Sequence, residues 1–482
     1  MSIHGAWQGS FHFLPRRPIV VEPSAAQLSS DAGLLPLREF DEQLGWTRQF
    51  AAALNDPRDP ASIDHSFLEM VRSRVYGILA DYEDQNDHDT LRHDPIFKLV
   101  AGRSPDAAPL ASQPTLSRFE NAIDIASLWH LRDVLIDQFI ASFATPPLQL
   151  TFDIDAVDDP AHGQQQLALF HGYFNQYQYF PLLITSADND QLVSLCLRPG
   201  NAHAALGADA ALEYLVNRLR HVWPQVRIRV RGDAGFGVPW MYHVCERRNL
   251  DYTFGFSSNA VLQRGTERLL AEAVRCFEQT GTPQRLFTAF WYKADSWPVQ
   301  RWVIAKVEVN AQGTNHRFVV TNRPGAFVLP AATYDDYVQR GESENRNKEF
   351  KCGLAMDRTS DHRFVANYFR LYLHALALNL LVRLRRAIAM PPTPQPPSEV
   401  PTAALAEPHR RRFFQQRRQA DPLGEGQPCT WRSLLIKVAA TVVVSSRRVL
   451  VRLANNWPHL NFYRQLCAYL RSPARPGVCP SG

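Results

Sequence analysis

Three carboxylates stand at points of the sequence where an acid could hold a metal ion. Asp155 lies where an alternating strand pattern meets a turn, Asp233 lies at the end of another strand, and Glu344 lies in the first turns of an expected helix. Ligands tend to bind at the loop-facing ends of strands in open α/β sheets. Three acids brought together repel one another unless a cation joins them, and hard oxygen ligands favour Mg²⁺ or Mn²⁺. Two such ions can activate a water or hydroxyl and stabilise the leaving oxygen of a phosphodiester.

For each acid taken alone, an ordinary role as a turn or capping residue is the better interpretation. The identity of the first acid is also open, because Asp153 lies two residues before Asp155 and on the same face of the strand. We favour Asp155 because it is closer to the turn, and keep Asp153 as the alternative.

The segment around Glu344 carries further polar side chains at regular intervals. Its pattern is Y-x2-R-x3-E-x6-K, formed by Tyr337, Arg340, Glu344 and Lys351, with Lys348 as a further candidate for DNA binding. Offsets of this kind predict one helical face. That face would present an acid for metal, cations for phosphate and a ring for stacking. As a bare pattern, the alternative is a salt-bridged surface helix.

This spacing resembles the Y-R-E-K signature of bacterial insertion-sequence DDE transposases, the transposase DDE domain group 1. Three other stretches resemble the same group in the same order: the first-aspartate strand at 152–155 with its hairpin at 162–165, L-R-P-G-N at 197–201, and R-x-D-x-G-F at 231–236. The resemblance covers about residues 90 to 385. It implies that Asp155, Asp233 and Glu344 are the catalytic and metal-binding acids. Two Mg²⁺ ions per active site are implied, for which Mn²⁺ can substitute.

The resemblance also implies a reaction and partners. The reaction is cleavage of DNA at the ends of an insertion sequence, followed by strand transfer into target DNA. The partner is double-stranded DNA, both terminal inverted repeats and target, bound by a homodimer. Two rivals stay open: an RNase H-like nuclease that cleaves without joining, and a non-catalytic DNA-binding protein derived from a transposase.

The elements that must position these residues change character along the chain. Apolar residues repeat at helical spacing over 63–82 and 115–143, which predicts a helical N-terminal domain at 1–145 for recognition of DNA ends. Alternating strands then begin, and we expect an RNase H-like α/β catalytic core at 146–384. A β-rich insertion is expected at about 255–330. A Pro-rich and Arg-rich linker at 385–430 and a C-terminal helical segment at 431–482 complete the chain.

Two tryptophans of the insertion are candidates for stacking on DNA. The family resemblance suggests that an aromatic residue there stacks on an unpaired base at the cut, and Trp291 and Trp297 are the candidates. Core or hairpin packing is the better interpretation for each of them.

The charge of the chain is unevenly distributed. The net charge is +5 over 482 residues, but residues 383–482 hold 16 Lys and Arg against 4 Asp and Glu, a local balance of 16 − 4 = +12. This asymmetry predicts a polyanion-binding C-terminal region, or else a solvated basic surface. The candidates for phosphate contacts are Arg410, Arg411, Arg412, Arg417 and Arg418.

The composition limits the class of protein. Hydrophobic residues make up 45% of the chain and aromatic residues 11%, so it can bury a core and is not disordered throughout. The seven cysteines form no CxxC pair, so neither a zinc site nor a disulfide framework is predicted. The N-terminus lacks the pattern of a signal peptide. We therefore expect a cytoplasmic, nucleoid-associated protein.

Overall fold

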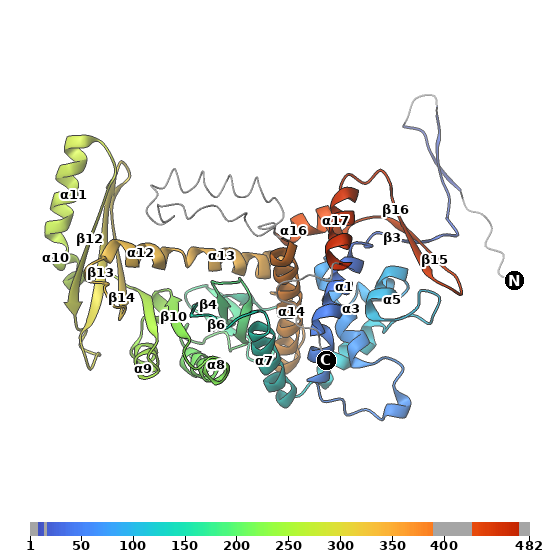
Figure 1. Ribbon diagram of the computed structural model, residues 1–482, viewed down its shortest axis with the longest axis horizontal. Helices are drawn as coiled ribbons and strands as arrows, with labels where there is room; N and C mark the ends of the chain where they lie inside the picture. Colours follow the sequence, from blue (N-terminus) through green and yellow to red (C-terminus); the bar gives the residue numbers. More distant parts are fainter. Residues whose placement is uncertain (1–7, 14–16, 389–426, 472–482) are drawn as a thin grey trace.

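The computed structural model of the protein describes residues 8–13, 17–388 and 427–471 (Figure 1). Its centre is a mixed sheet of eight strands in the order β12-β13-β14-β11-β10-β4-β8-β9. The predicted α/β class is confirmed. The strands are β4 (Gln149–Ala156), β8 (Leu182–Ser186), β9 (Leu192–Cys196), β10 (Arg227–Gly232), β11 (Asp251–Phe256), β12 (Gln284–Tyr292), β13 (Arg301–Asn310) and β14 (Gly313–Thr321).

Strand directions divide the sheet into three parts. β4, β8 and β9 are consecutive antiparallel neighbours, whereas β10 runs parallel to β4 on one side and to β11 on the other. β14 then pairs antiparallel with β11, and β13 and β12 continue outward from it. The segment expected as a β-rich insertion therefore extends the central sheet. It also contains α10 (Ala260–Gly265) and α11 (Glu267–Thr280).

The two faces of the sheet differ in polarity because side chains alternate along each strand. In β4, Leu150, Phe152 and Ile154 are fully buried in one hydrophobic core. Residues of α7 (Ile125–Ile140), α8 (Ala208–Val222) and α9 (Pro239–Arg247) share that core. The intervening residues Asp153 and Asp155 point to the opposite face.

The polar face is covered by the helices that follow the insertion. These are α12 (Pro330–Val338), α13 (Gly341–Lys348) and the π-helical turn η3 (Glu349–Gly353). In Figure 1, α12 and α13 run along one side of the sheet and α8 and α9 lie on the other. The candidate acids Asp155 and Asp233 at the strands thus lie beneath the helix that carries Glu344.

One long helix connects the sheet to the N-terminal helices. α14 (Phe364–Ile388) contacts α3 (Phe67–Leu79), α6 (Gln113–Ala122), α7 and β9. By length and composition it could cross a membrane, but 89% of its apolar window is buried within the protein. That burial identifies it as a core helix. The other helices of this body are α1 (Leu34–Leu44), α2 (Trp46–Ala52), α4 (His88–Leu91), α5 (Pro95–Ala101) and the short η1 (Pro60–Ser62).

The helical repeat over 115–143 forms two helices, where the spacing alone suggested one. α6 ends at Ala122 and α7 begins at Ile125, because Ile123 adopts an extended conformation. Asp124 then caps α7, accepting a hydrogen bond from the backbone N–H of Ser127 at 2.7 Å.

The C-terminal segment packs on the N-terminal body. It comprises α16 (Pro428–Trp431), η5 (Arg432–Ile436), the hairpin of β15 (Ala440–Val444) and β16 (Val449–Leu453), and α17 (Leu460–Arg471). β15 pairs with β3 (Gln27–Ser29) near the start of the chain. Beside this pairing, Lys437 Nζ lies 2.7 Å from a carboxylate oxygen of buried Asp31. A separate short hairpin, β1 (Gly9–Phe11) with β2 (Ile19–Val21), precedes β3.

Candidate active site

Asp155 and Asp233 are neighbours at the end of two parallel strands. The register between β4 and β10 pairs Asp153 with Arg231 and Ile154 with Gly232, so each acid directly follows the last residue that joins these two strands. Adjacent strands lie about 4.8 Å apart. Asp155 and Asp233 are therefore side by side at the carboxyl ends of these two strands.

The turn that carries Asp233 requires a close approach of three segments. The Asp233 carboxylate caps η2 (Ala234–Phe236), accepting a hydrogen bond from the backbone N–H of Gly235 at 2.8 Å. A Cβ at Gly255 in β11 would lie 2.7 Å from Ala234 N and 2.8 Å from Tyr337 Oη. Only glycine therefore allows the turn and the tyrosine to meet β11 as they do.

Glu344 is linked to Asp155 through Arg340. The Nη2 atom of Arg340 donates to Glu344 Oε1 at 2.9 Å, and its Nη1 atom lies 3.6 Å from Asp155 Oδ2. One guanidinium thus bridges an acid of the sheet and an acid of the helix. It takes the position between carboxylates that a cation would occupy.

Asn347 is a further contact of Asp155, and sequence reasoning missed it. Its Nδ2 donates to Asp155 Oδ2 at 2.8 Å, while Asp155 Oδ1 accepts from the backbone N–H of Ala156 at 2.9 Å. Asn347 lies three residues after Glu344, so the helical spacing that selected Arg340 would also have selected it.

The three acids affect one another electrostatically. Burial raises the pKa of Asp155 to about 6; Arg340 opposes this rise, whereas Asp233 and Glu344 add to it. The pKa of Tyr337 is also raised, first by burial, and Asp233 and Glu344 contribute to the rise. The predicted acids therefore share one electrostatic environment, and Tyr337 belongs to it.

Asp153 has a different environment from Asp155. It is 3% exposed, and Arg231 donates to both of its carboxylate oxygens at 2.7 and 2.8 Å. Arg231 also donates to the backbone oxygen of Asp336 at 2.7 Å, which fixes it under α12. The Asp153 carboxylate is therefore committed to an ion pair, which favours Asp155 as the first acid.

The carboxylates fit a divalent cation by their chemistry. As they stand, no group of three or more His, Cys, Asp or Glu side chains in the described ranges is arranged to hold a metal ion. Arg340 instead lies against two of the three acids, Asp155 and Glu344. Glu344 has a side chain that is 57% exposed, so it has room to turn toward the aspartates. Three oxygen-donor acids around one displaceable cation suit Mg²⁺ or Mn²⁺.

Lys351 of the predicted signature and the further candidate Lys348 lie farther along the same segment. The helix expected over 337–351 is divided: α12 ends at Val338, α13 begins at Gly341, and a π-helical turn follows at Glu349. Lys348 is exposed at the end of α13. Lys351 lies in the π-helical turn, where its Nζ is 2.8 Å from Asp158 Oδ1. Lys351 therefore faces the loop after β4, away from the contact between Arg340 and Glu344.

The two tryptophans proposed for stacking differ in accessibility. Trp291 is 51% exposed and stacks on Trp302 of the paired strand, with ring centroids 3.9 Å apart. Trp297 is 4% exposed and packs against Tyr242 and Phe256. Only Trp291 presents a ring to solvent. The basic residues Arg410, Arg411, Arg412, Arg417 and Arg418 lie outside the described residues.

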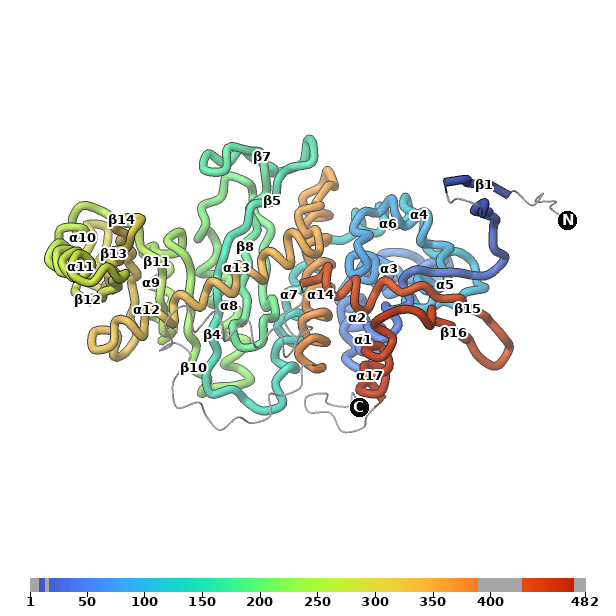
Figure 2. The backbone as a smooth tube through the Cα atoms, turned by 90° about the horizontal axis from the view of Figure 1, so that it is seen from above, coloured from blue at the N-terminus to red at the C-terminus, as the bar shows by residue number. Residues whose placement is uncertain are grey.

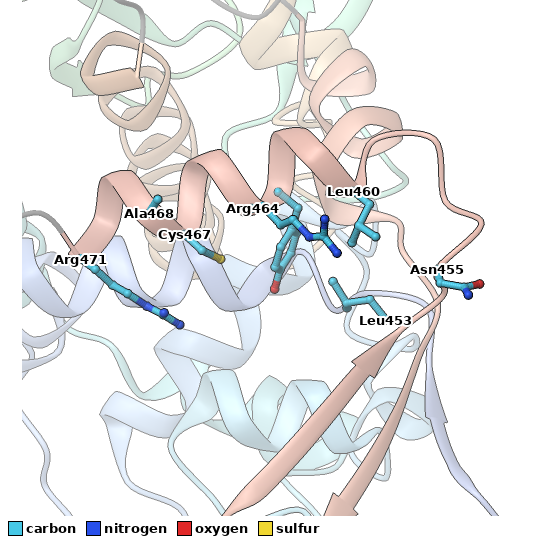
Figure 3. Close-up of a pocket in the computed structure, with 8 residues that line it drawn as sticks. Leu453, Asn455, Leu460, Arg464, Cys467, Ala468 and Arg471 are labelled. Carbon is cyan, nitrogen blue, oxygen red and sulfur yellow. The ribbon is translucent and has the colours of Figure 1, made fainter.

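A pocket of about 500 Å³ lies elsewhere, between β16 and α17 (Figure 3). Its lining comes from the C-terminal segment: Leu453, Asn455, Leu460, Tyr463, Arg464, Cys467, Ala468 and Arg471. None of the carboxylates described above contributes to it.

Comparison with known proteins agrees with the resemblance seen in the sequence. The family described as Transposase DDE domain group 1 matches residues 11–396, which is most of the chain. No curated protein matches the sequence.

Proposed function

The chain belongs to the transposase DDE domain group 1 family, and from this we propose that it cuts DNA at the ends of an insertion sequence and joins the freed 3′-hydroxyl to target DNA. The observation that carries the proposal is the meeting of Asp155 and Asp233 on adjacent parallel strands, with Glu344 linked to Asp155 through Arg340. Three acids beside a DNA-binding surface would only weaken pure binding, so their convergence favours catalysis over binding alone.

We propose that the core is RNase H-like. Support comes from the order β9-β8-β4-β10-β11, with three antiparallel strands followed by two parallel ones. The two aspartates then lie on adjacent central strands, and the glutamate lies on a helix over the polar face.

Asp155, Asp233 and Glu344 would hold two divalent cations, Mg²⁺ or Mn²⁺, which supply Lewis acidity for phosphodiester cleavage when bound. Arg340 would leave Glu344 and Asp155 and pair with a DNA phosphate, since its guanidinium suits phosphate geometry. Asn347 would hold Asp155 in its rotamer. Lys348 and Lys351 would contact the DNA backbone beside it.

Further contacts with DNA are proposed at two places. Trp291, which stacks on Trp302, would also stack on an unpaired base of DNA. Trp297 is buried and would have a packing role only. The basic tract at 410–418 would contact phosphates without reading sequence, so replacing its arginines should flatten the log–log salt slope by roughly 0.9 for each phosphate that is no longer neutralised. We propose terminal repeats and target DNA as partners, a homodimer as the DNA-bound form and the bacterial cytoplasm as the location.

The second candidate function is an RNase H-like nuclease that cuts without joining, because the same three acids would serve both reactions. Incubation of the protein with pre-cut ends and a supercoiled target plasmid separates the two. A transposase yields joined product in Mg²⁺, and Glu344→Gln yields none while still binding the ends. Joining by Glu344→Gln at the wild-type rate would contradict the assignment of Glu344.

A further inference from the structure

A hairpin whose exposed side chains carry no charge follows the strand of Asp155. It contains β5 (Asp159–Pro160), β6 (Leu169–His171) and β7 (Gln176–Tyr179), which form a small sheet of their own. Figure 2 shows β5 and β7 extending away from the central sheet. From Pro160 to Ser186 the sequence has no Lys, Arg, Asp or Glu; amide and aromatic side chains take their place. This surface cannot bind through charge.

Two sets of rings occupy the hairpin. The inner set is His171 and Phe174, which pack against buried Phe180 with centroids 5.0 and 5.7 Å away. The outer set is exposed: Phe170 is 47% exposed, Tyr173 86% and Tyr177 64%. Phe170 and Tyr177 lie opposite each other in the register, with centroids 5.6 Å apart. The inner set fixes the hairpin, and the outer set has large ring faces in solvent.

The base of the hairpin is tied to the segment that follows Glu344. The Gln165 Nε2 atom donates to the backbone oxygen of Asp361 at 2.8 Å, and the Gln166 backbone N–H donates to that of His362 at 2.9 Å. The buried carboxylate of Asp159 accepts a hydrogen bond from Thr359 Oγ1 at 2.8 Å. The hairpin is therefore held between the strand of Asp155 and the chain beyond Glu344.

The rings are within reach of DNA bound at the acids. Asp159 pairs with Tyr179, two residues from Tyr177. At about 3.3 Å per residue along a strand and about 5 Å across a pair, Tyr177 lies within roughly 25 Å of Asp155. That is about seven nucleotide steps of 3.4 Å.

We propose that Phe170, Tyr173 and Tyr177 form a stacking platform for unpaired bases of DNA beside the cleavage site. This inference rests on the proposed function, because it needs a DNA strand at Asp155. Aromatic rings stack on unpaired bases of any sequence, because every base has an aromatic face. The exposed amides of Gln164 and Asn175 can meet base edges, as amides do. Because the hairpin has no Lys or Arg, it lacks the side chains that neutralise phosphate charge.

The test measures binding to a forked duplex whose single-stranded arms carry 2-aminopurine, with EDTA present so that no cleavage occurs. The full chain should quench the fluorescence of the arm. Replacing Phe170, Tyr173 and Tyr177 together by alanine should remove the quenching and weaken fork binding by roughly 5- to 150-fold for each stacked base. Binding to a blunt duplex should not change. The salt slope should also stay constant, because the variant keeps every phosphate contact.

Two further variants separate stacking from loss of structure. Tyr173→Phe with Tyr177→Phe should retain fork binding and quenching, whereas Tyr173→Leu with Tyr177→Leu should lose both. Trp129→Ala is the matched control, because Trp129 is 55% exposed but lies on α7, which packs on the opposite face of the sheet. It should bind the fork as the wild type does.

Three outcomes would overturn the proposal. One is an equal loss on fork and blunt duplex. Another is unchanged DNA binding together with a change in the oligomeric state measured by light scattering, which would make the rings a contact between two copies of the chain. The third is unchanged behaviour in every measurement. Because the assay needs neither metal nor cleavage, failure of the catalytic proposal appears separately, in the joining assay with Glu344→Gln.

Discussion

Removal of Arg340 should change metal binding and catalysis in opposite directions. Its side chain is 14% exposed, donates to Glu344 at 2.9 Å and lies 3.6 Å from Asp155. A divalent cation entering between these acids must displace the guanidinium or be repelled by it. Arg340→Ala should therefore bind Mn²⁺ more tightly than the wild type when DNA is absent, yet join DNA ends more slowly.

The size of the effect follows from the charges involved. Two unit charges about 4 Å apart interact by about 1 kcal/mol in bulk water and about 4 kcal/mol near a protein surface. The site is partly open, so the lower part of this range applies. A gain of about 1 to 2 kcal/mol corresponds to roughly 5- to 30-fold tighter binding.

The assay is titration of Mn²⁺ at pH 8, with free Mn²⁺ measured by electron paramagnetic resonance. At this pH Asp155, with a pKa of about 6, is ionised in the wild type. Lys348→Ala is the matched control, because it removes one exposed positive charge from α13, the helix that begins directly after Arg340. Weaker or unchanged Mn²⁺ binding by Arg340→Ala would refute the idea that the guanidinium occupies the cation position.

Three other predictions address neighbouring residues. Asn347→Ala should lower Mn²⁺ affinity or joining activity by about 10- to 100-fold, because Asp155 loses its orienting donor. Asn345→Ala, which removes a hydrogen bond to Glu342, should not lower either. Equal effects of the two changes would show a general role of the helix. The pKa of Asp155 is raised to about 6, so protons should compete with the metal ion below that pH. Mn²⁺ affinity should therefore fall about tenfold per pH unit below pH 6 and level off above it. A flat affinity profile from pH 7 to 5 would contradict this. Trp297→Ala should lower the free energy of unfolding by about 3 to 5 kcal/mol. Trp291→Ala should leave the melting temperature nearly unchanged and weaken binding to DNA with an unpaired base by about 1 to 3 kcal/mol. Similar destabilisation by both variants would remove the distinction between a core ring and a stacking ring.

The sequence predicted the elements of the site better than their contacts. Alternation along 148–155 predicts a strand with two faces and places Asp155 near its end, as β4 shows. The ion pair of Asp153 with Arg231 depends on the register between β4 and β10. The sequence of neither strand alone predicts that register. A choice between the two aspartates therefore required the pairing of segments far apart in the chain.

Spacing arguments have a similar limit in the helical part of the site. They correctly group Tyr337, Arg340 and Glu344, which interact in the structure although α12 carries the first and α13 the last. They do not foresee the π-helical turn at Glu349–Gly353, which brings Lys351 to Asp158. Nor does the local pattern around 440–444 indicate that this strand pairs with residues 27–29, because that contact joins opposite ends of the chain.

The pairing of β3 with β15 sets the order in which the protein can be completed during synthesis. All strands of the central sheet have been made by Thr321, so the sheet can form while the chain is still growing. The helical body begins first, but its strand β3 has no partner until Ala440–Val444 leave the ribosome. Until then β3 is an unpaired edge, the kind of surface that invites pairing with other chains. The part of the protein that is translated first is thus finished last, and ribosomes that stop early would release a formed central sheet attached to an open body.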